Sequence, residues 1–191
     1  MYVSDLRHFP DLPPDVPAPA RRMAGHLALI VRAATAAETG GQWVSALPCE
    51  RRPGHRPCPG YLSVSRSDVA PSIRWWCTSC ADEGVISGWE RSPFDLRSPT
   101  MGNDPAKTFR AAIPPDAGAT LRSLLFLDSG SERLVFRAER SADGIVLAGA
   151  HDDLEQLIDS VAAEANHEDK RRRQKRLDDA LDALEGVLKQ I

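Results

Sequence analysis

The sequence predicts an α+β fold in which helical segments at both ends flank several short strands. Apolar residues recur at helical spacing over residues 19–38 and again over 152–191. Between them, short segments alternate polar and apolar residues, as half-buried strands do. All the cysteines of the chain fall in that middle part, at Cys49, Cys58, Cys77 and Cys80.

Composition divides the chain into four segments. Residues 1–16 are rich in proline and are expected to be extended or flexible. Residues 17–90 are expected to form one domain, which begins with the 19–38 helix and continues into strands. Residues 91–114 are rich in Pro, Ser, Gly and Asn, so we predict a linker. Residues 115–191 are predicted to form an α+β domain that ends in two helices.

In the C-terminal segment we predict a helix over 115–128, a strand over 132–138 and its hairpin partner over 144–147, then the helical pair. Apolar residues of the last helix repeat at 4-3-4-3 spacing, as in a coiled-coil seam. This seam is too short to stand alone. It must pack against the preceding helix, against the body of the domain, or against a protein partner or second copy. The seam residues are Leu177, Leu181, Leu184, Leu188 and Ile191.

The expected compartment is the cytoplasm. No stretch approaches the ~18 apolar residues that a membrane span needs. The N-terminus lacks the apolar region of a signal peptide. Thiols stay reduced in the cytoplasm, so four cysteines favour a metal site over two disulfides.

The cysteines follow the spacing C-x8-C-x18-C-x2-C, with short strands predicted over 61–65, 73–76 and 85–89. Zinc takes four soft donors in a tetrahedron, and a C-x2-C pair wraps two thiolates onto one ion. Three interpretations remain open: all four cysteines bind one Zn²⁺, His55 replaces Cys49, or the cysteines are ordinary buried residues without metal. Four thiolates would close the coordination sphere, which predicts a structural ion and no catalytic one.

Part of this segment resembles a zinc ribbon. The residues that carry the resemblance are Arg74-Trp75-Trp76-Cys77, the C-x2-C pair, and Glu83-Gly84-Val85-Ile86. The resemblance covers residues 49–90, and its first half departs from the family pattern because eight residues separate Cys49 from Cys58. Zinc ribbons often occur in transcription, replication and translation machinery, so the resemblance implies a structural zinc and an association with nucleic acid.

Two groups of residues are candidates for nucleic-acid contact. Arginines beside an aromatic ring can bind phosphates and stack bases, and these are Arg51, Arg52, Arg56, Arg74 and Trp75. Adjacent strand residues face opposite sides, so Trp75 and Trp76 cannot both point inward. The second group is a basic run that is either a phosphate-binding patch or a solvated link between helices: Lys170, Arg171, Arg172, Arg173, Lys175 and Arg176.

These patterns favour a non-enzymatic, zinc-stabilised protein that is nucleic-acid-associated or regulatory. The first alternative is a protein–protein adaptor in which zinc is purely structural and the C-terminal helices bind the partner. The net charge of -3 favours that version, since no region is strongly basic. The second alternative is an enzyme with an unrecognised site, although the sequence contains no Gly-rich phosphate loop, G-x-S-x-G or H-E-x-x-H motif.

Overall fold

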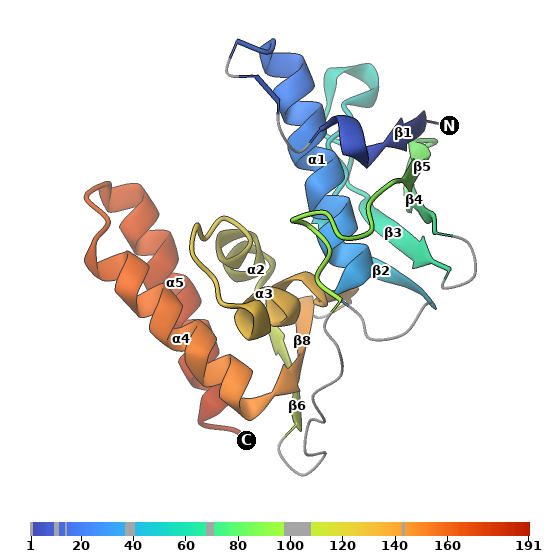
Figure 1. Ribbon diagram of the computed structural model, residues 1–191. Coiled ribbons are helices and arrows are strands. Elements are labelled where there is room, and N and C mark those ends of the chain that lie inside the picture. Colours follow the sequence, from blue (N-terminus) through green and yellow to red (C-terminus); the bar gives the residue numbers. More distant parts are fainter. Residues whose placement is uncertain are drawn as a thin grey trace. The chain divides into compact units, whose positions relative to one another are not determined.

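The computed structural model confirms the mixed α+β class. Within the residues it describes, it has five α-helices, two short 3-10 helices and eight strands (Figure 1). The chain forms two compact units, Met1–Ser98 and Pro99–Ile191, and each is described by itself. The described residues are 2–9, 12–13, 15–36, 41–67, 71–97, 108–142 and 144–191.

The first unit is built on a five-stranded sheet with the order β1-β5-β4-β3-β2. Strands β2 to β5 are antiparallel neighbours, and β1 pairs with β5 in parallel at the edge. The three strands expected around the cysteines are therefore part of a larger sheet. The N-terminus, expected to be extended or flexible, supplies an edge strand and the buried Leu6. The strands are β1 (Tyr2–Asp5), β2 (Gly41–Pro48), β3 (Tyr61–Arg66), β4 (Ile73–Cys77) and β5 (Glu83–Ser87).

Helix α1 (Ala18–Thr35) covers one face of this sheet and contacts β2, β3 and β4 (Figure 1). It ends at Thr35, earlier than the 19–38 helix predicted, and Glu38 lies outside the described residues. The apolar stripe of α1 and the inward residues of the strands form the core. Fully buried members are Leu6, Ile30, Val31, Ala34, Leu62, Val64, Ile73 and Ile86.

The second unit contains a three-stranded antiparallel sheet with the order β7-β8-β6 and four helices. Helices α4 and α5 lie side by side, and α2 contacts α5 while α3 contacts α4 (Figure 1). Its elements are β6 (Thr108–Ile113), α2 (Pro115–Leu121), α3 (Ser129–Phe136), β7 (Glu139–Ser141), β8 (Gly144–Ala150), α4 (His151–Asn166) and α5 (Arg171–Leu188).

Three predictions for this part of the chain were wrong in detail. The expected linker 91–114 contains strand β6, which pairs along its whole length with β8. The predicted strand 132–138 is mostly helix α3, and the hairpin partner of β8 is the short β7 that follows it. The helix predicted over 115–128 ends at Leu121, and a separate helix begins at Ser129.

The coiled-coil-like seam packs within its own unit. Leu177, Ala180 and Leu184 are fully buried, and α5 contacts α4 and α2. Of the three arrangements that the spacing allowed, the structure has packing against the preceding helix and the body of the unit. Among the seam residues, Ile191 is the exposed one. None of the described helices is both long enough and apolar enough to span a bilayer.

Asp128 determines where α3 begins. Its carboxylate accepts hydrogen bonds from the backbone N–H of Gly130 at 2.8 Å and of Ser131 at 3.1 Å. We expect Asp128→Ala to lower the free energy of unfolding by about 1 kcal/mol near neutral pH, the usual cost of losing an N-cap. Urea unfolding followed by far-UV circular dichroism measures this, with the exposed Asp116→Ala as the control.

The effect of Asp128 should depend on pH. Burial acts to raise the pKa of this carboxyl, but the hydrogen bonds from Ser131 and Gly130 outweigh it and lower the pKa below its usual range. A carboxyl with a depressed folded-state pKa stabilises the fold above its unfolded-state pKa and loses that contribution as the pH falls through the folded-state value. The difference between wild type and Asp128→Ala should therefore shrink in acid, and a difference that grows would contradict this role.

Candidate metal centre

Four strand ends bring the cysteines together at one end of the first unit. Cys49 directly follows β2, and Cys58 lies between a short 3-10 helix, η2 (Pro53–His55), and β3. Cys77 is the last residue of β4, and Cys80 lies in the turn that leads to β5. Because β2 to β5 are neighbours in the sheet, ligands separated in sequence meet in space.

The four sulfur atoms lie close together, and two of their separations match those expected around a tetrahedral metal ion. All of them lie within 4.8 Å of one another. Cys49 Sγ is 3.8 Å from Cys80 Sγ, and Cys58 Sγ is 3.6 Å from Cys77 Sγ. Both distances are far too long for a disulfide, whose S–S bond is about 2.05 Å. An ion with Zn–S bonds of about 2.3 Å places its sulfurs about 3.8 Å apart. The group could therefore hold a metal ion.

The eight-residue loop between Cys49 and Cys58 closes on itself. The backbone N–H of Cys58 donates to the carbonyl of Arg51 at 2.9 Å, which brings the chain back beside its starting point. The loop turns at Gly54 and His55, with φ of 60° and 66°. Gly54 adopts this left-handed conformation without steric cost. His55 is exposed and is not part of the sulfur group, whereas Cys49 is.

Close backbone packing also holds the ligands. The N–H of Cys49 donates to the carbonyl of Gly60 at 2.8 Å, and the N–H of Cys77 donates to the carbonyl of Asp82 at 2.8 Å. At Gly60 the chain passes so near the centre that a Cβ would lie 2.4 Å from Cys77 Sγ. Only glycine fits at this position without displacing the sulfur.

The thiols compete for ionisation. Burial raises the pKa of Cys49. Burial also acts to raise the pKa of Cys77, but the backbone N–H groups of Ser79 and Cys80 outweigh it and lower the pKa. The N–H of Asp82 acts to lower the pKa of Cys80, yet burial and the neighbouring thiols leave it raised. A bound cation would remove this competition, because a coordinating thiol is deprotonated outright.

No family model, curated protein or solved structure matches this chain. The assignment of the four thiols as metal ligands therefore rests on their own spacing and chemistry. A second group, His151, Asp152 and Glu155, also has ligand atoms within 4.8 Å of one another. It lies at the start of α4, where His151 and Glu155 are helical neighbours, and its two carboxylates are exposed. Such groups are common on helix surfaces without a metal, so the buried cysteines are the stronger site.

In the first unit, the residues predicted to contact nucleic acid differ in their exposure to solvent. Trp75 is only 5% exposed, so its ring is not available as a stacking surface. It packs inward, with its ring edge-to-face at 5.8 Å from His26. Trp76 points to the opposite face and is partly exposed, as strand alternation requires. The predicted arginines of the first unit are exposed, namely Arg51, Arg52, Arg56 and Arg74.

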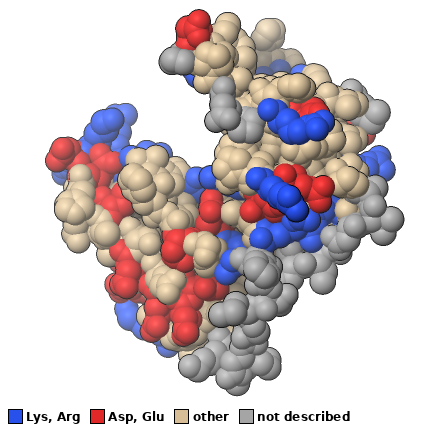
Figure 2. All heavy atoms as spheres, viewed as in Figure 1, with Lys and Arg blue, Asp and Glu red and all other residues tan. Residues whose placement is uncertain are grey.

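The basic run at the start of α5 is only partly available. Lys170, Arg171 and Arg172 are exposed, whereas Arg173 forms ion pairs with Glu164 and with Glu168. Figure 2 shows acidic and basic side chains intermixed on the viewed face, with no continuous basic surface.

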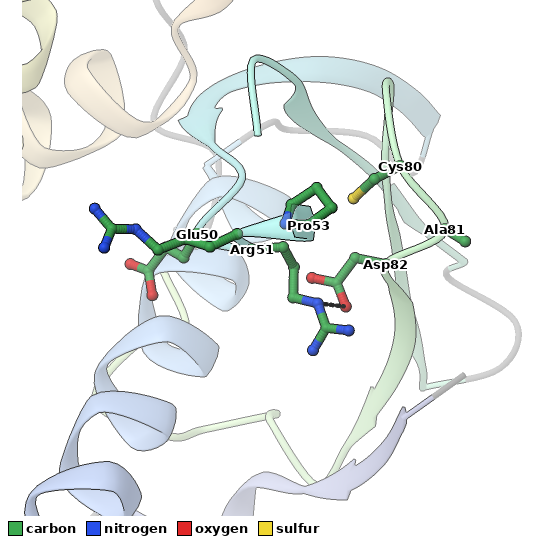
Figure 3. A pocket seen from close by; sticks show the side chains of 7 residues that line it. Glu50, Arg51, Pro53, Cys80, Ala81 and Asp82 are labelled. Carbon is green, nitrogen blue, oxygen red and sulfur yellow. Dashed lines mark ion pairs between the residues drawn. The ribbon is translucent and has the colours of Figure 1, made fainter. Parts of the chain in front are cut away.

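Sequence reasoning missed Asp82, which is the most buried acidic side chain near the metal centre. Its side chain is 7% exposed, and its Oδ1 lies 3.7 Å from Arg51 Nε. Figure 3 shows the two side chains pointing toward each other beside Cys80. Asp82 lies two residues after the C-x2-C pair, and nothing in the sequence indicates that it is buried beside Arg51.

Proposed function

We propose that Cys49, Cys58, Cys77 and Cys80 bind one structural Zn²⁺ and that the surrounding strands are a zinc ribbon with an enlarged first knuckle. The observation that carries this proposal is the sulfur geometry, with separations of 3.6 and 3.8 Å in a buried group. Four thiolates suit zinc, and they fill a tetrahedral coordination sphere. Such a site stabilises the fold and leaves no position for a substrate, so the role is non-enzymatic.

The proposed activity of the first unit is binding of nucleic acid. The loop between the first two cysteines exposes Arg51, Arg52 and Arg56, and β4 exposes Arg74 next to the partly exposed Trp76. Arginines beside an aromatic ring can bind the backbone and stack a base. Trp76 replaces Trp75 in this proposal because the ring of Trp75 is buried. In the second unit, Lys170, Arg171 and Arg172 would supply further phosphate contacts.

The adaptor alternative depended on an apolar seam along the last helix. Leu177 and Leu184 of that seam are fully buried within the second unit. Since those side chains already have their apolar contacts, we place nucleic-acid binding ahead of the adaptor function.

A salt series tests this function. We expect a labelled single-stranded oligonucleotide to bind the protein and the affinity to fall steeply between about 50 and 200 mM salt, because phosphate contacts release counterions. The double variant Arg52→Glu, Arg56→Glu should bind at least about tenfold more weakly, with a shallower salt dependence. Fluorescence anisotropy measures both effects.

The control for that variant is Arg137→Glu, Lys189→Glu. It changes the net charge equally but alters exposed residues of the second unit that belong to neither basic group. Its affinity should stay within about twofold of wild type at about 150 mM salt, where distant charges are screened. Equal losses in both variants would mean that general charge, and not this loop, governs binding. No binding by the wild type at low salt would refute the function.

A further inference from the structure

A hollow of about 300 Å³ lies beside the metal centre, within the usual size range of small-molecule sites. Its walls come from the start of α1, from β1 and from β4. They are mainly apolar or aromatic, and they include Tyr2, Met23, His26, Leu27 and Trp75. Tyr2 and Met23 are 46% and 44% exposed, so large apolar groups remain uncovered at its mouth.

A buried carboxylate lines this hollow. The side chain of Asp82 is 93% buried, since 7% of it is exposed. Its Oδ1 accepts no hydrogen bond within the described part of the chain, and Arg51 Nε is 3.7 Å away, beyond hydrogen-bond distance. A buried acceptor without a donor is unfavourable. A ligand that donated hydrogen bonds to Asp82 would satisfy this atom.

Positive charge lies directly next to the carboxylate. A second hollow, of about 700 Å³, shares Glu50, Arg51 and Asp82 with the first and adds Arg52 (Figure 3). Arg51 also donates to the hydroxyl of Tyr2 at 3.2 Å, so it bridges the two hollows. An aromatic-lined recess with a buried acceptor and exposed arginines at its rim matches the parts of a nucleotide: base, hydrogen-bonding edge and phosphate.

We propose that this hollow receives one unstacked base of a single strand, and that guanine is the preferred base. The proposal rests on the function proposed above, binding of nucleic acid by the first unit. The base would lie against the Tyr2 side of the hollow, and Arg51 and Arg52 would contact the adjoining phosphates. Carboxylate oxygens only accept hydrogen bonds. Guanine presents a ring N–H and an exocyclic amino group side by side, and both can donate to Asp82.

Pyrimidines and adenine fit this acceptor less well. Thymine and uracil carry one ring N–H between two carbonyl oxygens, and those oxygens would face the carboxylate. Cytosine and adenine each offer an amino group next to a ring nitrogen that is itself an acceptor. The expected order of affinity is therefore guanine first, cytosine and adenine next, and thymine or uracil last. A good bidentate contact corresponds to about tenfold discrimination between bases.

The test uses the full chain and labelled oligothymidylates of about eight nucleotides, a length that one small binding unit covers. One member is pure thymidylate, and the others carry a single central guanine, cytosine or adenine. For the wild type, anisotropy should show about tenfold tighter binding to the guanine oligonucleotide than to pure thymidylate. Asp82→Asn should abolish that preference, so that the guanine oligonucleotide and pure thymidylate bind the variant with affinities within about twofold of each other. The control Glu83→Gln removes the neighbouring, exposed carboxylate and should keep the preference.

A second variant guards against disturbance of the metal centre, since Asp82 lies close to Cys80. Tyr2→Ala alters an edge strand far from the sulfurs in sequence and should weaken binding of the guanine oligonucleotide about fivefold or more through lost stacking. Tight binding without base preference, or a preference that survives both Asp82→Asn and Tyr2→Ala, would overturn the base pocket and leave the proposed function standing. Failure of every oligonucleotide to bind the wild type at low salt would overturn both.

Discussion

Cys77→Ser is expected to abolish metal binding and to unfold the first unit at room temperature. Cys77 is a proposed metal ligand, the last residue of β4 and a member of the buried core. Metal-binding energy becomes folding energy in small metal-stabilised units, where it amounts to about 10–16 kcal/mol. A domain's total stability is only about 5–15 kcal/mol, so loss of the ion leaves little or nothing.

Tryptophan signals report this effect on the first unit alone. All four tryptophans of the chain, Trp43, Trp75, Trp76 and Trp89, lie within it. In Cys77→Ser the near-UV circular dichroism should collapse and the emission should shift to the red, as buried indoles meet water. Far-UV signal from the helices of the second unit should persist.

The matched control is Ser79→Ala, which changes an exposed residue of the same turn and removes no sulfur. It should keep the wild-type tryptophan signals and the metal. A Cys77→Ser protein with wild-type tryptophan signals and a wild-type melting temperature would show that the fold does not depend on a metal at these cysteines.

Gly60→Ala is expected to have the second largest effect. A Cβ at this position would lie 2.4 Å from Cys77 Sγ and 2.9 Å from the side chain of Ser79, closer than atoms can approach. Either the sulfur or the chain leading into β3 must move. Overpacking of this kind costs about 1–3 kcal/mol. Urea unfolding followed by tryptophan fluorescence measures the decrease in the free energy of unfolding. Competition with a coloured zinc chelator measures the expected decrease in zinc affinity.

Gly25→Ala is the natural control, because it makes the same chemical change in helix α1. Apart from its chain neighbours and the backbone of the helix itself, no atom of the described residues lies within 4 Å of a Cβ built there. Alanine favours the helix, so this variant should be neutral or stabilised by up to about 1 kcal/mol. If Gly60→Ala were equally harmless and held zinc as tightly as the wild type, the chain near Cys77 would have room that the structure does not show.

Local patterns were sufficient to predict much of the first unit. The helical spacing of Leu27, Ile30 and Val31 predicted α1, and alternation predicted that Trp75 and Trp76 face opposite sides of β4. The cysteine grouping followed from spacing and from the chemistry of thiols. Cys49 was predicted as a ligand with His55 as the alternative, and the sequence could not decide between them, since the hydrogen bond from Cys58 to Arg51 that closes the unusually long loop is not visible in it.

The second unit was harder to predict because its elements are short. Leu134, Val135 and Phe136 form a continuous apolar run, which is compatible with a strand or with a buried helix. Asp128 caps the N-terminus of a helix over this run, whereas the sequence analysis placed Asp128 at the end of the preceding predicted helix, 115–128. Strand β6 escaped notice because its partner β8 lies more than thirty positions away along the chain.

The base-pocket residues share no pattern in sequence. Tyr2, Met23, Arg51 and Asp82 come from four different elements or turns and meet only after the sheet, α1 and the first-knuckle loop are in place. Sequence analysis identified Arg51 as a candidate for nucleic-acid contact but gave no reason to associate it with Asp82.

The most direct test of the central claim is the metal content of the wild-type chain. Protein purified without added metal, weighed by native mass spectrometry and again after denaturation, should carry one zinc ion per chain, with all four cysteines reduced. Elemental analysis of the same sample identifies the ion. A folded chain that carries no metal, with tryptophan signals unaffected by a strong chelator, would contradict the structural zinc and the zinc-ribbon assignment that depends on it.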